Sequence, residues 1–497
     1  MRALVWFRRD LRLADNPAVH AASKAEILLP VYIHAPAEAG AWPIDSTVGA
    51  AAAWGLHEAL QALANELQTR QQQLHIAQGN SLEQLLLFIA QANITHVFWN
   101  RQYEPWAITR DKQLKQALRE RGIICESFNA SLLLEPWNIT TREQKPYQVF
   151  TPFWKTAQSL LQINAELKAP STLPPAPRLE TKINLATLAL KPAIGWDKAF
   201  YSHWVLTEKQ AQQRLRSFAR HEVAEYDTQR DQPAVDGTSA LSPYLQLGII
   251  SPRQIWRGIE KVRADVAVSQ RSALDIYLKE LGWREFAYHL LFHFPDTPET
   301  ALRPAFRRFK WRDLNSVAAQ KDLGAWQQGQ TGIPIIDAGM RQLWQTGWMH
   351  NRVRMLVASF LTKNLRLPWQ VGAQWFWDTL LDADLASNTL GWQWSAGCGA
   401  DAAPYFRIFN PVLQSQKFDS QGEYLLRWLP ELSGLAKIAT SRKTGGKAEW
   451  LHAPWLAPAT VLQQAGILLG ETYPAPIVDL QQSRVAALAA YQHLKDD

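Results

Sequence analysis

The chain has 497 residues, of which 47% are hydrophobic and 20% charged, and its formal net charge is +7. This composition is typical of a globular protein with more than one domain, and it excludes fibrous and disordered chains. The two cysteines, Cys125 and Cys398, cannot form a disulfide framework, and no apolar run is long enough for a signal peptide or a membrane span. We therefore expect a cytoplasmic protein with no membrane partner.

Strand and helix patterns alternate over residues 1–130. Apolar strands are expected at 3–7, 27–33, 74–79, 95–100 and 123–129, and helices at 17–23, 48–70, 81–92 and 111–122. This alternation predicts an α/β domain with a parallel sheet. Neither GxGxxG nor GxxxxGK[ST] is present, so a nucleotide here would be bound by other means.

Residues 131–200 are rich in proline and lack periodicity, which indicates a long surface connection. From residue 201 onward helical patterns dominate. The predicted organisation is an α/β domain at 1–130, an interdomain linker at 131–200 and a helical domain at 201–497.

Two helical patterns carry candidate functional side chains. In 277–291, Glu280, Trp283 and Arg284 share one face, which is either a surface patch with an ion pair or a stacking platform for a base. In 347–365, Asn351 and Met355 share a face with Arg354, whereas Arg352 points elsewhere. Asparagine suits the reading of base edges, although a methionine is more often core.

Three further segments combine polar and aromatic residues. The hydroxyl-rich run 238–242 precedes a helix and suits either a phosphate cradle or a helix cap. Residues 303–312 interleave basic and aromatic side chains, as in a nucleic-acid groove or a solvated helix edge. Residues 382–410 combine acids, amides, glycines and tryptophans without clear periodicity. This predicts irregular or short-helical backbone around a large aromatic group, with an ordinary polar loop as the alternative. Tryptophan occurs 23 times, and several copies occur in such polar contexts.

Five motifs stand in a fixed order: FRRDLRLADNPAV, GTSALSPYLQLGIISP, KELGWREF, WQQGQTGIPIIDAGMRQLWQTGWMHNRVRM, and DADLASNTLGWQW followed by DAAPYFRIFNP. Together they resemble the DNA photolyase/cryptochrome family over nearly the whole chain. These motifs are most similar to those of bacterial cyclobutane pyrimidine dimer photolyases of class III, which are plant-cryptochrome-like, or of class I. The resemblance implies an α/β antenna domain followed by an all-α domain that binds FAD and DNA.

The resemblance also implies roles for single residues. Positions that match the family's FAD site are Tyr226, Thr238, Ser239, Ala240, Leu241, Ser242, Arg284, Arg354, Asp382, Asp384 and Asn388, the last facing the flavin N5. Positions that match the pocket for a flipped-out dimer are Glu280, Trp283, Asn351, Met355 and Trp394. Arg230, Arg352 and Gln414 match contacts to the DNA strand. Trp392, Trp369 and Trp311 match an electron relay; Trp311 aligns only if 315–319 is an insertion, and the ungapped position is Ser316.

The implied activity is light-driven repair of cyclobutane pyrimidine dimers in DNA by a deoxyribodipyrimidine photo-lyase, a carbon–carbon lyase. The electron comes from light-excited reduced FAD (FADH⁻), with Glu280, Asn388 and the three relay tryptophans as the reacting set. Because Asn388 stands where plant cryptochromes usually have aspartate, and because no long tail follows the helical domain, repair is favoured over the alternative, a cryptochrome-like blue-light photoreceptor. Residues 100–111 carry Pro-Trp-Ala where folate-binding bacterial photolyases have the glutamate that holds the folate, so a methenyltetrahydrofolate antenna bound at a different place is expected. We expect no metal site, and a monomer in the bacterial cytosol or nucleoid.

Overall fold

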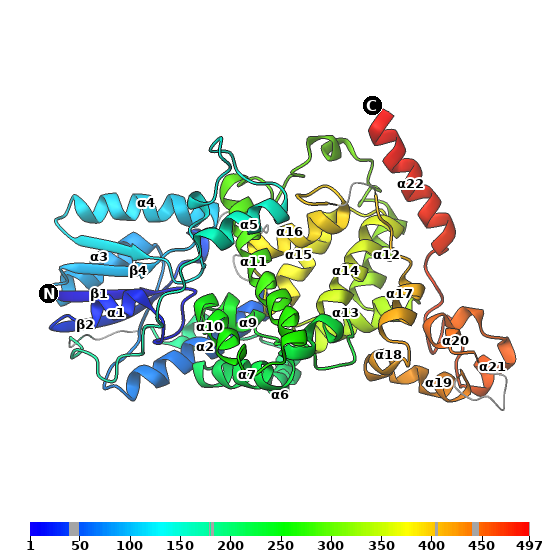
Figure 1. The fold of residues 1–497 in the computed structure, drawn as a ribbon, viewed down its shortest axis with the longest axis horizontal. Coiled ribbons are helices and arrows are strands. Elements are labelled where there is room, and N and C mark those ends of the chain that lie inside the picture. Colours follow the sequence, from blue (N-terminus) through cyan, green and yellow to red (C-terminus); the bar gives the residue numbers. More distant parts are fainter. Residues whose placement is uncertain (39–48, 178, 180–182, 403–405, 440–446, 497) are drawn as a thin grey trace. The chain divides into compact units, whose positions relative to one another are not determined.

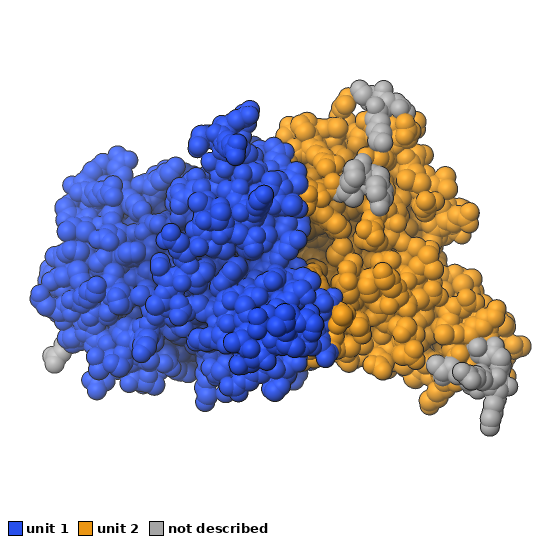
Figure 2. All heavy atoms as spheres, viewed as in Figure 1, with its two compact units in different colours: residues 1–227, 238–298, 381–387 blue, residues 228–237, 299–380, 388–497 orange. Residues whose placement is uncertain are grey.

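The computed structural model describes residues 1–497 except 39–48, 178, 180–182, 403–405, 440–446 and 497. The described chain forms two compact units (Figure 2). Unit 1 comprises residues 1–227, 238–298 and 381–387, and unit 2 comprises 228–237, 299–380 and 388–497. No helix among the described residues is both long enough and apolar enough to cross a membrane.

Unit 1 is built on a parallel five-stranded sheet in the order β3-β2-β1-β4-β5 (Figure 1). Its strands are β1 (Arg2–Phe7), β2 (Ile27–His34), β3 (His75–Gln78), β4 (His96–Asn100) and β5 (Ile124–Phe128). The register pairs Ala3 with Leu28 on one side and with His96 on the other. These strands are mostly buried apolar runs, as expected where helices cover both faces of a parallel sheet. The predicted α/β architecture is confirmed.

Four helices connect the strands: α1 (Pro17–Ala22), α2 (Ala50–Gln68), α3 (Ser81–Ala92) and α4 (Pro105–Arg119). Asparagine caps begin two of them, because Asn16 accepts from the Val19 N–H and Asn80 accepts from the N–H groups of the first turn of α3. Helices α3 and α4 share one buried cluster with the indoles of Trp6 and Trp99. Helix α4 begins six residues before its predicted start, with Pro105 in the first turn.

The rest of unit 1 is helical. Its elements are α5 (Phe150–Leu160), α6 (Phe200–His203), α7 (Glu208–His221), α9 (Ser242–Gln246), α10 (Pro252–Val262) and α11 (Arg271–His293). The short α8 (Tyr226–Gln229) runs from unit 1 into unit 2. Helix α5 lies inside the segment expected to be a surface connection, and it buries Phe150, Phe153 and Trp154 while packing on α11.

Unit 2 is helical throughout. Its elements are α12 (Val317–Gln327), α13 (Pro334–Thr346), α14 (Asn351–Ser359), a π-helical turn at Phe360–Asn364, α15 (Trp369–Thr379), α16 (Leu385–Ala396), α17 (Pro411–Phe418), α18 (Glu423–Trp428), α19 (Ser433–Ala439), α20 (Glu449–His452), α21 (Ala459–Gln464) and α22 (Leu480–Asp496). The first three residues of α16 belong to unit 1. The expectation of irregular or short-helical backbone after residue 382 is therefore only partly right, since α16 has 12 residues. Both cysteines are free and buried.

Candidate active site

The hydroxyl-rich run 238–242 lies at the start of α9. Ser242 is the first residue of this helix, its side chain is exposed, and its hydroxyl donates to Asp382 Oδ2 at 2.5 Å. Ala240 has a left-handed backbone with φ of 45°, which turns the chain into the helix. The run therefore presents hydroxyl groups at the edge of a buried carboxylate.

Two tyrosines form the wall beside this run. Tyr277 donates from its hydroxyl to Ser239 Oγ at 3.0 Å, and the ring of Tyr226 stands edge-on to it at 5.1 Å. Burial raises the pKa of Tyr277, so its hydroxyl stays protonated and continues to donate. Tyr277 thus links Tyr226 to Ser239, and the assignment of these residues to an FAD site stays a prediction.

Asp382 and Asp384 are both buried in unit 1, with 8% and 7% of their surface exposed. Asp384 accepts from the Ser387 N–H at 2.8 Å through Oδ1, which caps α16, and from the Tyr288 hydroxyl through Oδ2 in a short hydrogen bond. The backbone between the two acids is fixed by Gln246, whose Nε2 donates to the Ala383 carbonyl at 3.0 Å. These contacts hold both carboxylates in defined places.

Arg284 lies between the acids and the segment after β5. Its guanidinium carbon lies 4.8 Å from the centre of the Tyr288 ring, and its Nη1 donates to the Ser131 carbonyl at 2.6 Å. The neighbouring Glu285 accepts from the N–H groups of Leu133 and Leu134 at 3.0 Å. Burial raises the pKa of Glu285 to about 7. The loop at 131–134 is therefore fixed to α11 by two consecutive side chains.

Glu280 and Trp283 lie one turn apart on α11 and are both partly exposed. The indole of Trp283 stacks on the ring of Phe150 with a centroid distance of 3.6 Å and an interplanar angle of 8°. A carboxylate and a flat aromatic surface thus occur together, as the pattern in 277–291 predicts.

Helix α14, in unit 2, carries the second set of candidate site residues. Asn351 is its first residue and is exposed. Arg352 forms an ion pair with Asp231 at 2.6 Å, lies over the ring of Phe418 at 4.6 Å, and places Nη1 3.8 Å from the sulfur of Met355. The expectation that Arg352 points away from Met355 is wrong, because its guanidinium contacts both the Met355 sulfur and Asp231.

Three arginines surround the N-terminus of α14. Burial, which Asp231 opposes, and charge repulsion by Arg354, Arg352 and Arg230 together lower the pKa of His350, which caps this helix, to about 4. Arg354 itself donates from Nε to the Met349 carbonyl at 2.7 Å. His350 is therefore neutral at physiological pH, and the cluster keeps a net positive charge toward a polyanion.

Asn388 and Trp392 lie on α16 and pack against α15. Asn388 is 9% exposed, and its Nδ2 donates to the Ala373 carbonyl at 3.0 Å. Because that partner is a carbonyl, the amide orientation is set and Oδ1 is left as an acceptor. Trp392 is 2% exposed, and it lies so close to α15 that a Cβ on Gly372 would come within 2.1 Å of the indole.

The other two relay candidates also lie in unit 2. Trp369 is 2% exposed and begins α15, one turn before Gly372. Trp311 is partly exposed and lies 4.4 Å from the ring of Phe309. Ser316, the ungapped alternative, caps α12 through its hydroxyl and has no ring to carry charge.

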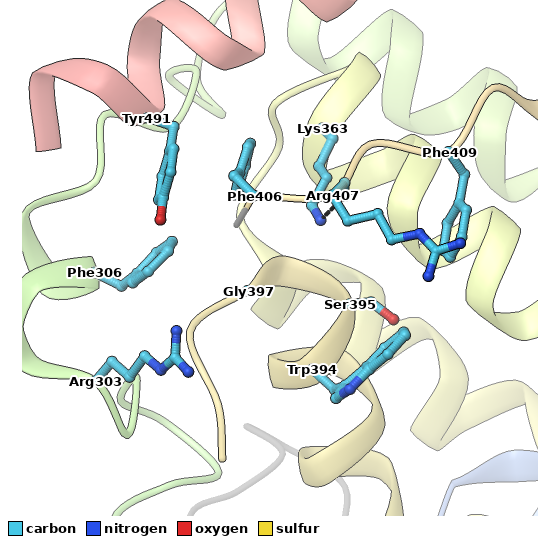
Figure 3. A pocket seen from close by; sticks show the side chains of 10 residues that line it. All are labelled: Arg303, Phe306, Lys363, Trp394, Ser395, Gly397, Phe406, Arg407, Phe409 and Tyr491. Carbon is cyan, nitrogen blue, oxygen red and sulfur yellow. Dashed lines mark hydrogen bonds between the residues drawn. The ribbon is translucent and has the colours of Figure 1, made fainter. Parts of the chain in front are cut away.

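Trp394 is two residues after Trp392, which on a helix places it on roughly the opposite face. It lines a small cavity with four other aromatic residues and three cations (Figure 3). The lining residues are Arg303, Phe306, Lys363, Trp394, Ser395, Gly397, Phe406, Arg407, Phe409 and Tyr491. Gln414, the remaining candidate for DNA contact, lies partly exposed on α17.

Sequence reasoning missed several residues that shape these surfaces. Lys363 is buried, donates to the Arg407 carbonyl, and has its pKa lowered by burial to about 7. A lysine inside the apolar run FLTKNL was the available signal. Trp326 stands edge-on to Trp392, with 6.1 Å between the ring centres. The sequence shows Trp326 only as the first residue of the motif WQQGQTGIPII and does not indicate this contact. Nothing in the local sequence indicates the partners of Phe150 or Tyr288.

The residues of unit 1 fit an FAD site. Hydroxyls at 238–242 are suited to phosphate oxygens, and a buried carboxylate at Asp382 is suited to N–H donors. In the same region, Oε1 of Gln246 is buried and has no hydrogen-bond partner among the described residues, although a buried acceptor normally has one. A ligand with both phosphate and polar ring groups would satisfy this set.

Comparison with known proteins agrees with this geometry. The model described as the FAD binding domain of DNA photolyase matches residues 277–493, and the model described as DNA photolyase matches residues 3–176. The deoxyribodipyrimidine photo-lyase of Agrobacterium fabrum is 43% identical over 496 residues, covering 99% of this chain and 98% of that protein. The chain belongs to the DNA photolyase family.

Two further relatives show the range of this likeness. Cryptochrome-2 of Arabidopsis thaliana is 36% identical, covering 97% of this chain and 77% of that protein. The crystal structure of a bacterial class III photolyase from Agrobacterium tumefaciens has a TM-score of 0.92 at 42% identity, covering 100% of this chain and 98% of that chain. The predicted family, the predicted FAD-binding domain and the predicted enzyme class, deoxyribodipyrimidine photo-lyase, are confirmed by these matches.

Proposed function

We propose that this photolyase repairs cyclobutane pyrimidine dimers that are flipped out of DNA, and that Glu280, Trp283, Asn351, Met355 and Trp394 contact the lesion. The observation that carries this proposal is the pair on α11, where a flat, partly exposed indole lies one turn from a carboxylate. An aromatic face stacks on a base with about 1–3 kcal/mol, and a carboxylate accepts the N–H groups of pyrimidine edges.

Flipping is easier for a dimer than for a normal base pair, because the damaged bases stack and pair badly. Arg230, Arg352 and Gln414 would hold the strand by contacts to its phosphates and sugars, which position the duplex without reading its sequence. The positive cluster around His350 supports this role for the arginines. Asn351, exposed at the start of α14, would supply an amide to a pyrimidine edge.

The cofactor in this proposal is FAD in its reduced form, FADH⁻. When bound and excited by light, it supplies the electron that opens the cyclobutane ring and takes the electron back. The residues at 238–242 would hold its phosphates, while Arg284, Arg354, Asp382 and Asp384 would hold its ring and linker. Asn388 would present an amide at the ring, and because an amide does not release a proton at neutral pH, this position favours the anionic reduced form that repair needs.

Trp392, Trp369 and Trp311 would carry electrons from the surface to the flavin, so that light can also restore the reduced form. The burial of Trp392 beside α15, the burial of Trp369 at the start of α15 and the partial exposure of Trp311 support this order. A methenyltetrahydrofolate antenna completes the proposal. A near-ultraviolet absorption band of the purified protein, in excess of the band that its FAD accounts for, checks this last point.

The activity is tested with oligothymidylate that has been irradiated with ultraviolet light. The reduced protein is mixed with this substrate, illuminated with blue light, and followed by the recovery of thymine absorbance. We expect recovery in the light and none in the dark. Flavin photoreduction without any recovery would instead identify a cryptochrome-like photoreceptor, and recovery only with an oligonucleotide that carries a (6-4) lesion would contradict the substrate.

A further inference from the structure

Three aromatic rings lie nearly parallel between α5 and α11, two helices that pack on each other (Figure 1). Phe150 is the middle ring. Its centroid is 3.6 Å from that of Trp283 at an angle of 8°, and 6.2 Å from that of Trp154 at an angle of 11°. Phe150 is 1% exposed and Trp154 is 7% exposed, whereas Trp283 is partly exposed. Trp283 is therefore the most exposed ring of the three, and the two rings of α5 are both buried.

The inner part of this stack is tightly fixed. A Cβ on Gly282 would come within 2.5 Å of Trp154, so this glycine lets the indole lie directly against α11. The ring of Phe286 stands edge-on to Phe150 at 5.8 Å and to Trp283 at 6.0 Å. Phe150 thus has little freedom to rotate. Because its ring lies face to face with the Trp283 indole, it also restricts the rotation of that indole.

We propose that Phe150 is a positioning residue for substrate recognition, because it fixes the plane of the Trp283 indole before the lesion binds. This inference rests on the proposed role of Trp283 in contacting the dimer. One face of Trp283 is covered by Phe150, and because the indole is partly exposed, part of its surface is left for a lesion. An indole that is already held in one orientation loses less conformational freedom on binding than one that rotates freely.

The expected loss of affinity for damaged DNA follows from the strength of the Phe150–Trp283 ring contact. An aromatic pair contributes about a 2- to 12-fold factor to an equilibrium constant beyond the burial of its area. If Phe150 acts through Trp283, losing the ring should weaken binding to damaged DNA by about this factor. Binding to undamaged DNA depends mainly on phosphate contacts and should not change.

The test compares two leucine substitutions on the same helix in the FAD-loaded, full-length protein. Phe150→Leu keeps an apolar side chain but removes the flat face. Phe153→Leu is the matched control, because Phe153 is 0% exposed and its ring contacts Phe150, Phe286 and His289, whereas no ring contact joins it to Trp283 among the described residues. Dissociation constants are measured in the dark for a duplex with one thymine dimer and for the same duplex without damage.

We expect Phe150→Leu to lower the ratio of the two affinities by about 2- to 12-fold and Phe153→Leu to leave it unchanged. Equal losses in both variants would mean that α5 is merely loosened, and would overturn the proposal. An unchanged ratio in Phe150→Leu would overturn it as well. A wild-type protein that does not prefer the damaged duplex would overturn the proposed function itself.

A double-mutant cycle separates an effect of Phe150→Leu on the orientation of Trp283 from a general loosening of the fold. In a Trp283→Leu background, Phe150→Leu should cause no further loss of lesion affinity, since it has no indole left to orient. A second full loss would contradict the proposal. The pairing is also checked without DNA, because the fluorine resonance of 5-fluorotryptophan at Trp283, assigned by its absence in Trp283→Phe, should shift in Phe150→Leu and not in Phe153→Leu.

Discussion

Replacement of Trp392 by phenylalanine should separate photoreduction of the flavin from repair of the dimer. The proposed residues for these two processes, Trp392 and Trp394, lie on opposite faces of α16. The Trp392 indole is 2% exposed, lies against Gly372, and stands edge-on to Phe376 at 5.0 Å. A phenylalanine fills only part of this space, so we expect the free energy of unfolding to fall by about 1–3 kcal/mol, a cost that leaves the protein folded. Light-driven reduction of the oxidised flavin should be lost, because the first step of the proposed relay is removed.

The assay uses the same preparation in two states. Flavin photoreduction is followed by visible absorbance after a flash, starting from the oxidised protein with an external reductant present. Dimer repair is followed separately, starting from protein that has been reduced chemically. Trp392→Phe should fail the first assay and repair at the wild-type rate in the second, because Trp394, two residues on, lies on the other face and still lines its cavity.

Trp326→Phe is the matched control. Trp326 is also fully buried, at 0% exposure, and its ring centre lies 6.1 Å from that of Trp392. A similar packing loss is therefore introduced beside the relay without interrupting it, and both activities should remain. Loss of repair in chemically reduced Trp392→Phe, or equal loss of photoreduction in Trp326→Phe, would refute the separation of the two processes.

Three further substitutions follow from the contacts of the site. Glu285→Gln should remove a pH dependence of the free energy of unfolding. In the wild-type protein the pKa of Glu285 is raised from 4.5 to about 7, so the free energy of unfolding falls by up to about 3 kcal/mol as the pH rises from 4.5 to 7. Thermal unfolding at pH 5 and pH 8 measures this, and a wild-type protein that gains stability across the window would contradict it. Tyr288→Phe should cost about 1.5–3 kcal/mol by removing the hydrogen bond to Asp384, and should release FAD faster on dialysis; unchanged retention would count against a role for that carboxylate in holding FAD. Arg352→Gln should weaken binding to damaged and undamaged duplexes alike and reduce the slope of log affinity against log salt by about 1. A loss confined to damaged DNA would show that Arg352 contacts the lesion and not the strand.

The sheet followed from the sequence because β1, β2 and β4 are short, mostly apolar and buried runs that need no long-range information to recognise. Helix α5 did not, because its buried rings pack against α11, which is more than a hundred residues away in the chain. Prolines on both sides of it masked the local pattern. Its contribution to the candidate site, the ring of Phe150 beneath Trp283, is therefore a tertiary feature.

The segment after residue 382 shows a second limit. Helix α16 is buried over most of its surface and mixes amides, small residues and tryptophans, so it lacks the one-sided apolar pattern by which helices are recognised. The motifs nevertheless identified Asn388, Trp392 and Trp394 as candidate site residues. The orientation of Arg352 was missed for a similar reason, since its ion pair with Asp231 depends on a distant segment of the chain.

The most direct measurement of the central claim is blue-light repair of a single, defined thymine dimer by the reduced protein, compared with Trp283→Ala and with a dark sample. The account predicts that the wild-type protein converts the dimer to two thymines only in the light. It also predicts that Trp283→Ala, which lacks the stacking face, binds the damaged duplex more weakly by about 1–3 kcal/mol. A reduced, FAD-loaded wild-type protein that binds the duplex but leaves the dimer intact under illumination would contradict the account.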